Sequence, residues 1–297
     1  MSVATPAARA ALPALVAGAV FIGFAPIFVR LTDVGYTACA FWRVALALPV
    51  LLLWLRPGTG AERVIRPGIA WLWLAGLFFA ADLAVWHQSI RYTSVANATL
   101  MANLAPVFVT LASFAFFGER FRVAFLAGIA LAIGGAAVLV SNSLRLGGES
   151  ATGDLLGVLS AVFYSGYIIG IARARQRFTA AESLFWSTLA SACALLPLAW
   201  LLGDSFWPQS RQGWAVLLGL ALLSQSAGQG LIAYALAHLR PAFSAVGLLV
   251  QPVAAAVLAW WLLAEPLGAR QAAGAAIVLA GIVICRLTMA ASKASTN

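Results

Sequence analysis

Two charged side chains lie inside the long apolar runs of this chain, where they could bind a polar solute. Asp82 falls in the run 68 to 90 and Arg43 in the run 36 to 55. An Asp near the bilayer centre costs about 2.5 to 3.5 kcal/mol on insertion scales, so it requires a partner or a function. Both residues should lie roughly 10 to 12 Å below the same membrane surface. Two hypotheses follow: an Arg43–Asp82 ion pair that joins two helices, or a charge that faces a cavity and meets the ammonium or carboxylate of a zwitterion.

An aromatic and a titratable ring follow Asp82 on the same run. Trp86 lies one turn further along and offers either a stacking surface or an anchor at the membrane interface. His87 could carry a proton near neutral pH, or form an interfacial hydrogen bond. We therefore expect Asp82, Trp86 and His87 to approach a solute near the end of this helix.

Uncharged polar residues gather in other apolar runs. Gln225 and Gln229 are four residues apart and should share one helix face. Amides facing lipid would be poorly satisfied, so this face should point toward other helices or water, and both helix–helix hydrogen bonding and ligand recognition fit. The further candidates for substrate contact are Asn97, Met101 and Asn103 in one run, Ser160, Tyr164 and Tyr167 in a second, and Ser244 and Gln251 in a third.

The composition places all of these residues in a bilayer. Hydrophobic residues make up 63% of the 297 residues and charged residues 9%, and the mean hydropathy is +0.97; these values are typical of a membrane protein. Runs of about 20 residues are long enough to cross the hydrocarbon core as helices. The connections are too short to form a soluble domain. The predicted spans are 11 to 30, 36 to 55, 68 to 90, 94 to 117, 121 to 140, 152 to 171, 182 to 202, 213 to 237, 242 to 264 and 268 to 288.

The second half of the chain repeats the first. The segment 104 to 121 reads LAPVFVTLASFAFFGERF and aligns without gaps on VQPVAAAVLAWWLLAEPL at 250 to 267, so that Pro106 matches Pro252 and Glu119 matches Glu265. Each half holds five runs, and an odd number makes the second copy enter the membrane from the opposite side, as in many secondary transporters. We predict two inverted five-helix repeats, 1–144 and 145–297, within one all-α membrane domain of ten transmembrane helices.

The positive charge supports a topology with both termini in the cytoplasm. Of 18 Lys and Arg residues, twelve fall on the side of the N-terminus, five on the other side, and Arg43 within a span. This asymmetry follows the positive-inside rule and accounts for the net charge of +9 without a nucleic-acid partner. The predicted location is a bacterial inner membrane.

The positions of proline and glycine predict where helices could bend and where they could pack closely. Pro106 and Pro252 occupy equivalent places in the two halves, and Pro26 interrupts the first run. Because proline removes a backbone donor and permits a kink, we interpret these three as hinges for alternating access. Small residues at helical spacing favour close helix contact: Gly128, Ala132 and Gly135 in one run, and Gly274, Val278 and Gly281 in the equivalent run.

These features together resemble the EamA family of the drug/metabolite transporter superfamily over essentially the whole chain. The strings FFGER (116 to 120) and LLAEP (262 to 266) are similar to the helix-end motif of that family in both halves. Within the family, the chain resembles YddG-like exporters of aromatic and other amino acids. The resemblance implies export of small metabolites by alternating access, from a central cavity built by helices 1, 3, 4, 6, 8 and 9.

Several motifs of other function classes are missing from the sequence. It contains no phosphate-binding GxxxxGK[ST] loop and no HExxH. The spacing of its three cysteines matches no metal site. We therefore predict a transporter of amino acids or similar small molecules, not an enzyme, with no cofactor and no metal. Export of nucleobases or lipophilic drugs is the first alternative and a non-transporting membrane enzyme the second; the oligomeric state is left open.

Overall fold

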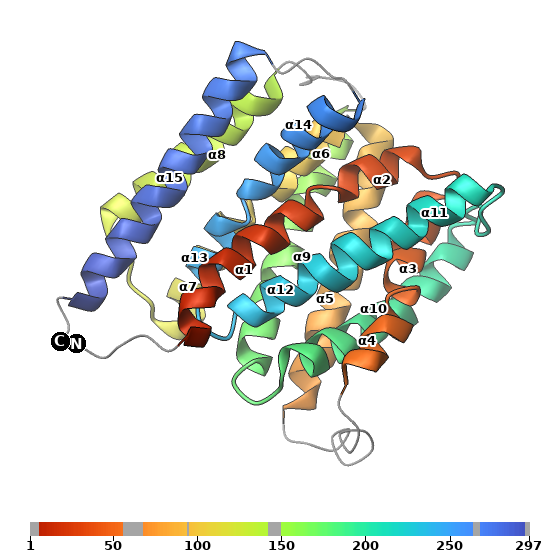
Figure 1. Ribbon diagram of the computed structural model, residues 1–297, viewed down its shortest axis with the longest axis horizontal. Coiled ribbons are helices and arrows are strands. Elements are labelled where there is room, and N and C mark those ends of the chain that lie inside the picture. The colour runs from red at the N-terminus through yellow and green to blue at the C-terminus, as the bar shows by residue number, and fades with distance from the viewer. Residues whose placement is uncertain (1–5, 56–67, 94, 142–149, 264–267, 295–297) are drawn as a thin grey trace.

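The computed structural model describes residues 6–55, 68–93, 95–141, 150–263 and 268–294, and every extended regular element in these ranges is a helix (Figure 1). Nine segments of this described part are long and apolar enough to span a membrane, and Val123–Val138 is a shorter apolar helix. The all-α membrane fold predicted from the sequence is therefore confirmed. The inverted relation of the halves and the location of the termini stay predictions, and the expected boundary at residue 144 lies outside the described ranges.

Many of the predicted spans consist of two consecutive helices. In the first half the helices are α1 (Pro6–Ile22), α2 (Ala25–Leu31), α3 (Tyr36–Ala45), α4 (Leu48–Trp54), α5 (Ile69–Tyr92), α6 (Val95–Ala102), α7 (Ala105–Phe117) and α8 (Val123–Val140). In the second half they are α9 (Ser150–Ala174), α10 (Ala180–Leu201), α11 (Arg211–Gly219), a π-helical segment (Leu220–Gly228), α12 (Gln229–Ala235), α13 (Pro241–Gly247), α14 (Val250–Leu263) and α15 (Ala269–Ala294).

The three predicted hinge prolines lie at interruptions of this kind. Pro26 follows the break between α1 and α2, Pro106 the break between α6 and α7, and Pro252 the break between α13 and α14. Proline is tolerated in the first turn of a helix, where its missing N–H has no intrahelical acceptor. By contrast, Pro197 lies inside the continuous helix α10. Proline alone therefore does not cause the interruptions, and their role as hinges stays a prediction.

The two runs with small residues at helical spacing form α8 and α15, and these helices contact each other closely. These two helices lie side by side along their length (Figure 1). A Cβ atom added to Gly128 would lie 2.6 Å from Cys285 Sγ, and one added to Gly281 would lie 2.6 Å from the Ala132 backbone nitrogen. Only glycine permits this approach of the two backbones.

The helices that position the polar residues pack around α5 and α9. These two helices make one of the most extensive contacts in the described structure, and α10, α3 and α6 pack against them. α1 lies along α12 and the π-helical segment (Figure 1). The main hydrophobic core contains residues of both halves, among them Phe79, Tyr167 and Val246. The two halves therefore form one packed unit, with the helix interruptions near its interior.

Candidate functional site

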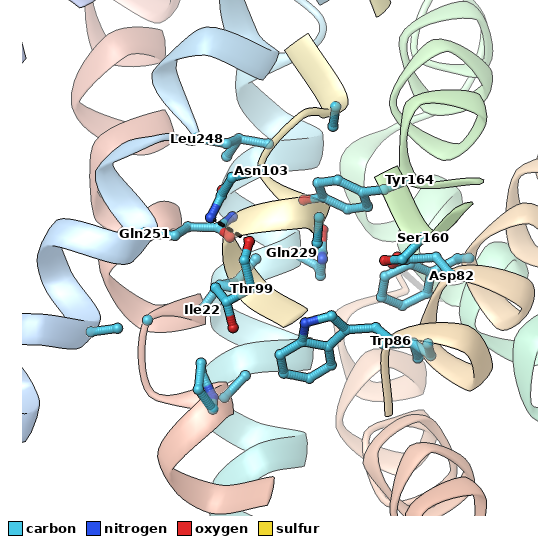
Figure 2. Close-up of a pocket in the computed structure, with 18 of the residues that line it drawn as sticks. Ile22, Asp82, Trp86, Thr99, Asn103, Ser160, Tyr164, Gln229, Leu248 and Gln251 are labelled. Carbon is cyan, nitrogen blue, oxygen red and sulfur yellow. Dashed lines mark hydrogen bonds between the residues drawn. The ribbon is translucent and has the colours of Figure 1, made fainter. Parts of the chain in front are cut away.

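A cavity of about 80 Å³, here called the central cavity, lies where the interrupted helices meet α5 and α9 (Figure 2). Its wall includes the interruptions themselves, at Ile22 and Gly23, at Ala102 and Asn103, and at Leu248. Broken helices that meet at one internal site are the usual way in which secondary transporters line a binding site. The cavity therefore lies where movement of half-helices would change its shape.

The prolines leave three main-chain carbonyl groups near the central cavity without their usual helical donor. A proline at position i has no N–H to donate to the carbonyl of residue i−4. For Pro26, Pro106 and Pro252 those carbonyls belong to Ile22, Ala102 and Leu248, and all three residues line the cavity. Leu248 receives a shorter-range bond from the Gln251 backbone N–H at 2.9 Å. The residues that carry these carbonyl groups therefore lie in the wall of the central cavity.

Asp82 lies on the cavity wall and is held by a neutral hydroxyl. Its side chain is 7% exposed, and Ser160 Oγ on α9 donates a hydrogen bond of 2.5 Å to Oδ1. Figure 2 shows Asp82 and Ser160 together on one side of the cavity. This bond fixes the carboxylate without neutralising its charge, so a cationic group of a ligand could still bind it.

Arg43 lines the same cavity and forms a hydrogen bond with a neutral side chain. Arg43 Nε donates to Gln225 Oε1 at 3.3 Å, and its Cζ lies 5.6 Å from the centre of the Phe79 ring. No hydrogen bond joins Arg43 to Asp82 within the described residues, but the two groups attract each other electrostatically, and their pairing stays a prediction. Gln225 and Ser160 supply neutral hydrogen-bond partners, and both charged residues line the central cavity.

Gln225 and Gln229 have different hydrogen-bond partners, and of the two only Gln229 lines the central cavity. Gln225 Nε2 donates to Thr188 Oγ1 on α10 at 3.0 Å while its Oε1 accepts from Arg43. Gln229 lines the central cavity and accepts a bond of 3.3 Å from the Tyr167 hydroxyl. Gln225 lies in the π-helical segment Leu220–Gly228 and Gln229 begins α12, and the shared helix face predicted for them stays a prediction. Gln225 therefore joins helices, whereas Gln229 faces the cavity.

Three polar groups of the cavity wall have no hydrogen-bond partner among the described residues. They are Thr99 Oγ1, the Tyr164 hydroxyl and Gln251 Nε2, from α6, α9 and α14. The Tyr164 hydroxyl lies near the side-chain amides of Gln229 and Gln251 but makes no hydrogen bond of normal geometry with either. Figure 2 shows Thr99 and Gln251 across the cavity from Asp82. Buried polar groups are normally paired, so these three atoms fit a site that accepts a polar ligand.

Trp86 and His87 have different surroundings although they are adjacent. Trp86 is 8% exposed and lines the cavity, with its ring between the Asp82 side and the Thr99 side in Figure 2. His87 is fully buried and does not line the cavity. Its Nδ1 carries the hydrogen that is donated to the Leu83 carbonyl at 2.8 Å, and its Nε2 has no partner in the described structure. A proton-carrying role for His87 stays a prediction.

Other predicted contacts lie behind the wall. Tyr167 is fully buried, stacks on Phe79 at 4.5 Å between ring centres and supports Gln229. Met101 packs against Gly157 on α9, and the hydroxyl of buried Ser244 has no partner among the described residues. These three residues and Pro252 do not line the cavity, while Pro26 and Pro106 do. The side chain of Asn97 lies outside the described residues.

Thr99 and Phe79 are cavity residues that the sequence predictions omitted. Ser160 and Asn103 were candidates by virtue of their polarity, but a lone Thr and a Phe within apolar helices give no such signal. Their positions depend on where α6 ends and how α5 faces α9, and residue type does not encode either.

Comparison of the sequence with known proteins identifies a family of transporters. The sequence model of the EamA-like transporter family matches residues 9–141 and 151–287. The pseudopaline exporter CntI of Pseudomonas aeruginosa is 27% identical over 242 residues, which are 81% of this chain and 83% of that protein. A probable terminal-alkyne amino-acid exporter of Streptantibioticus cattleyicolor is 28% identical over 266 residues, covering 88% of this chain and 87% of that one.

A solved structure shares the fold. A crystal structure whose title gives no function superposes with a TM-score of 0.79 at 18% sequence identity, and the match covers 94% of this chain and 97% of that one. At this identity the likeness concerns the fold alone.

Proposed function

We propose that this chain, which belongs to the EamA-like transporter family, exports amino acids or closely related zwitterionic metabolites through its central cavity. The family and its exporter relatives point to a transporter rather than an enzyme. The two relatives are named as exporters of pseudopaline and of a terminal-alkyne amino acid, and these names support export as the direction of transport. The chain is a multi-pass membrane protein; we propose the bacterial inner membrane as its location, with both termini in the cytoplasm.

The two opposite charges of Arg43 and Asp82 in the wall of one cavity carry the proposal. Burying two charges is costly, and side chains that simply joined two helices would gain most by pairing directly. Here each charge is held by a neutral partner, and both face one cavity. An amino acid carries the complementary pair, an ammonium for Asp82 and a carboxylate for Arg43, and charge-assisted hydrogen bonds are the strong ones.

The rest of the wall supports a polar metabolite with some apolar surface. Trp86, Phe79 and Tyr164 provide aromatic faces that could contact an aliphatic or aromatic side chain. A lipophilic drug would leave the unpartnered Thr99, Tyr164 and Gln251 groups unsatisfied, and this is unfavourable. A nucleobase could satisfy those groups but would not use both charges.

Transport requires the central cavity to change size. At about 80 Å³ it is below the roughly 300 Å³ that ordinary small-molecule sites occupy. The interruptions before Pro26, Pro106 and Pro252 lie in the wall or beside it, so movement of the half-helices there would enlarge the cavity and open it to one side at a time.

Uptake into liposomes that hold the purified protein tests the substrate class. Radiolabelled Trp, Phe, Met and Thr are offered with and without a pH gradient, and empty liposomes are the control. Saturable uptake that unlabelled amino acids inhibit supports the proposal, and its need for the gradient separates facilitative from proton-coupled transport. If none of the four is taken up under either condition, the amino-acid assignment fails and nucleobases and drugs are tested next.

A further inference from the structure

A second hollow lies apart from the central cavity, and we call it the Glu119 cavity. It has a volume of about 390 Å³ and lies between the end of α7, the end of α9 and the turn that joins α12 to α13. It shares no lining residue with the central cavity. A volume above roughly 300 Å³ is enough for a small metabolite. Its charged lining residues are Glu119, Arg173, Arg175 and Arg240, and His238 lies beside them.

One carboxylate oxygen of Glu119 points into the protein and has no hydrogen-bond partner among the described residues. α7 ends at Gly118, which adopts a left-handed conformation with φ 66°, and the Glu119 backbone N–H bonds back to the Ser113 carbonyl at 3.1 Å. This turn fixes the direction of the Glu119 side chain. Its Oε2 is buried and has no hydrogen-bond partner in the described ranges. A buried carboxylate oxygen without a donor is unfavourable, so the site fits a ligand that donates to it.

Two arginines of the same cavity keep their guanidinium groups available. Arg173 Cζ lies 4.0 Å from the centre of the Phe117 ring, a cation–π contact that orients the group without neutralising it. Arg240 is exposed and immediately precedes α13. Neither forms an ion pair with another residue that the structure describes. The positive-inside rule accounts for arginines at this end of the bundle, but it does not account for the unpartnered oxygen of Glu119 among them.

Arg175, by contrast, is part of the wall. Its Nε donates to the Ala233 carbonyl at 2.8 Å and its guanidinium also bonds to the Phe178 carbonyl. Burial lowers the pKa of Arg175, and nearby Glu182 opposes that shift. These bonds fix the end of α9 against α12, so Arg175 shapes the Glu119 cavity while Arg173 and Arg240 remain free to bind.

We propose that the Glu119 cavity is a second binding site, which takes the ammonium of an amino acid on Glu119 and its carboxylate on Arg173 and Arg240. The inference rests on the proposed function, because a solute that waits here could pass on to the central cavity when the half-helices move. The ligand chemistry is one positive and one negative group on the same small molecule. Phosphatidylethanolamine offers the same pair in its headgroup, so the test separates the two sources.

Protection of a single cysteine inside the Glu119 cavity tests this site directly. Gln176 is exposed and lines the cavity, so Gln176→Cys is built in a Cys193→Ser background, because Cys193 is the exposed native thiol among the described residues and Cys39 and Cys285 are buried. The protein is placed in phosphatidylcholine nanodiscs, and its reaction with a maleimide is followed in the presence of L-alanine. The labelling rate should fall roughly tenfold at about ten times the Kd of L-alanine.

Matched variants show whether the protection comes from L-alanine bound at Glu119. Protection should persist with Asp82→Asn, which alters only the central cavity, and should be lost with Glu119→Gln. A cysteine at the exposed position Arg120, which does not line the cavity, should not be protected. Propionate or ethylamine, each with only one of the two charges, should protect much less than L-alanine. Equal protection by these ions, or protection that survives Glu119→Gln, would overturn the proposal.

The labelling assay also identifies the source of the ligand, and together with the uptake measurement it tests the link to transport. If added phosphatidylethanolamine slows labelling in a Glu119-dependent way and L-alanine does not, the site belongs to a lipid headgroup and the solute proposal is wrong. If the wild-type protein transports amino acids but L-alanine does not protect the cysteine, only the proposal of a binding site in the Glu119 cavity is wrong. Protection without any transport leaves this site standing and contradicts the proposed function instead.

Discussion

Arg43 and Asp82 line one cavity from two helices, and each forms a hydrogen bond with a neutral side chain. Gln225 supports the guanidinium, and Ser160 supports the carboxylate. Two opposite charges in the wall of one cavity can bind a zwitterion with charge-assisted hydrogen bonds at both ends. The predictions below follow from this relationship and from the helix interruptions around it.

Asp82→Asn should lower transport of amino acids strongly. A hydrogen bond to a charged group contributes about 1.5 to 3 kcal/mol, so kcat/KM should fall roughly 10- to 100-fold. Ser160→Ala removes only the support of the carboxylate and should cost less. Initial uptake rates in liposomes, normalised to the amount of inserted protein, measure both. Unchanged kinetics in Asp82→Asn would show that this carboxylate does not contact the substrate.

Tyr164→Phe should weaken substrate binding without lowering stability, whereas Tyr167→Phe should lower stability. The Tyr164 hydroxyl is unpartnered, so its removal should leave the thermal unfolding temperature unchanged or slightly higher while the substrate Kd rises. The Tyr167 hydroxyl donates to Gln229, so its removal should cost about 1 kcal/mol of stability. Thermal unfolding in detergent with and without substrate measures both quantities. Equal behaviour of the two variants would contradict a ligand-binding role for Tyr164.

Pro106→Ala and Pro252→Ala should slow the exchange between open states. Alanine supplies the N–H that each proline lacks, and that group can bond to the carbonyl of Ala102 or Leu248 and straighten the interrupted span. Pro197→Ala is the control, since α10 is continuous there. Spin-label distance distributions between exposed positions 120 and 176, recorded with and without substrate, are the measurement. If the cavity prolines behave like Pro197, they are not hinges.

Gly128→Ala and Gly281→Ala should destabilise the contact between α8 and α15. The new methyl group would lie 2.6 Å from an atom of the facing helix in each case, and overpacking of this kind costs about 1 to 3 kcal/mol. Gly134→Ala on the same helix α8 has nothing within 4 Å of its added Cβ and should be neutral or stabilising. Thermal unfolding of the three variants compares them. Similar unfolding temperatures would show that this contact yields easily.

The helices were predictable because bilayer insertion selects for long apolar runs. Hydropathy locates the spans to within a few residues, and glycine spacing predicts that α8 and α15 make close helix contacts, although it does not predict which helices they contact. The cavity was predictable in part: the cost of a buried charge singles out Asp82 and Arg43, and both line it.

The remaining details depend on local helix geometry that residue type does not show. Gln225 binds Arg43 and Thr188, whereas Gln229 binds Tyr167 and lines the central cavity, and their spacing along the chain does not predict this difference. The end of α6 brings Thr99 to the cavity and leaves Met101 against α9. Arg43 and Asp82 bind Gln225 and Ser160, which lie on other helices. Such partners are set by three-dimensional packing rather than by spacing along one helix.

Competition by analogues that lack one charge tests the central claim most directly. Uptake of radiolabelled phenylalanine into proteoliposomes is measured against unlabelled phenylalanine, phenethylamine, which lacks the carboxylate, and hydrocinnamate, which lacks the ammonium. If Arg43 and Asp82 together bind a zwitterion, only phenylalanine should compete at low concentration, and both analogues should need roughly 10-fold more or higher. Competition by either analogue as strong as that of phenylalanine would contradict recognition of both charges in the central cavity.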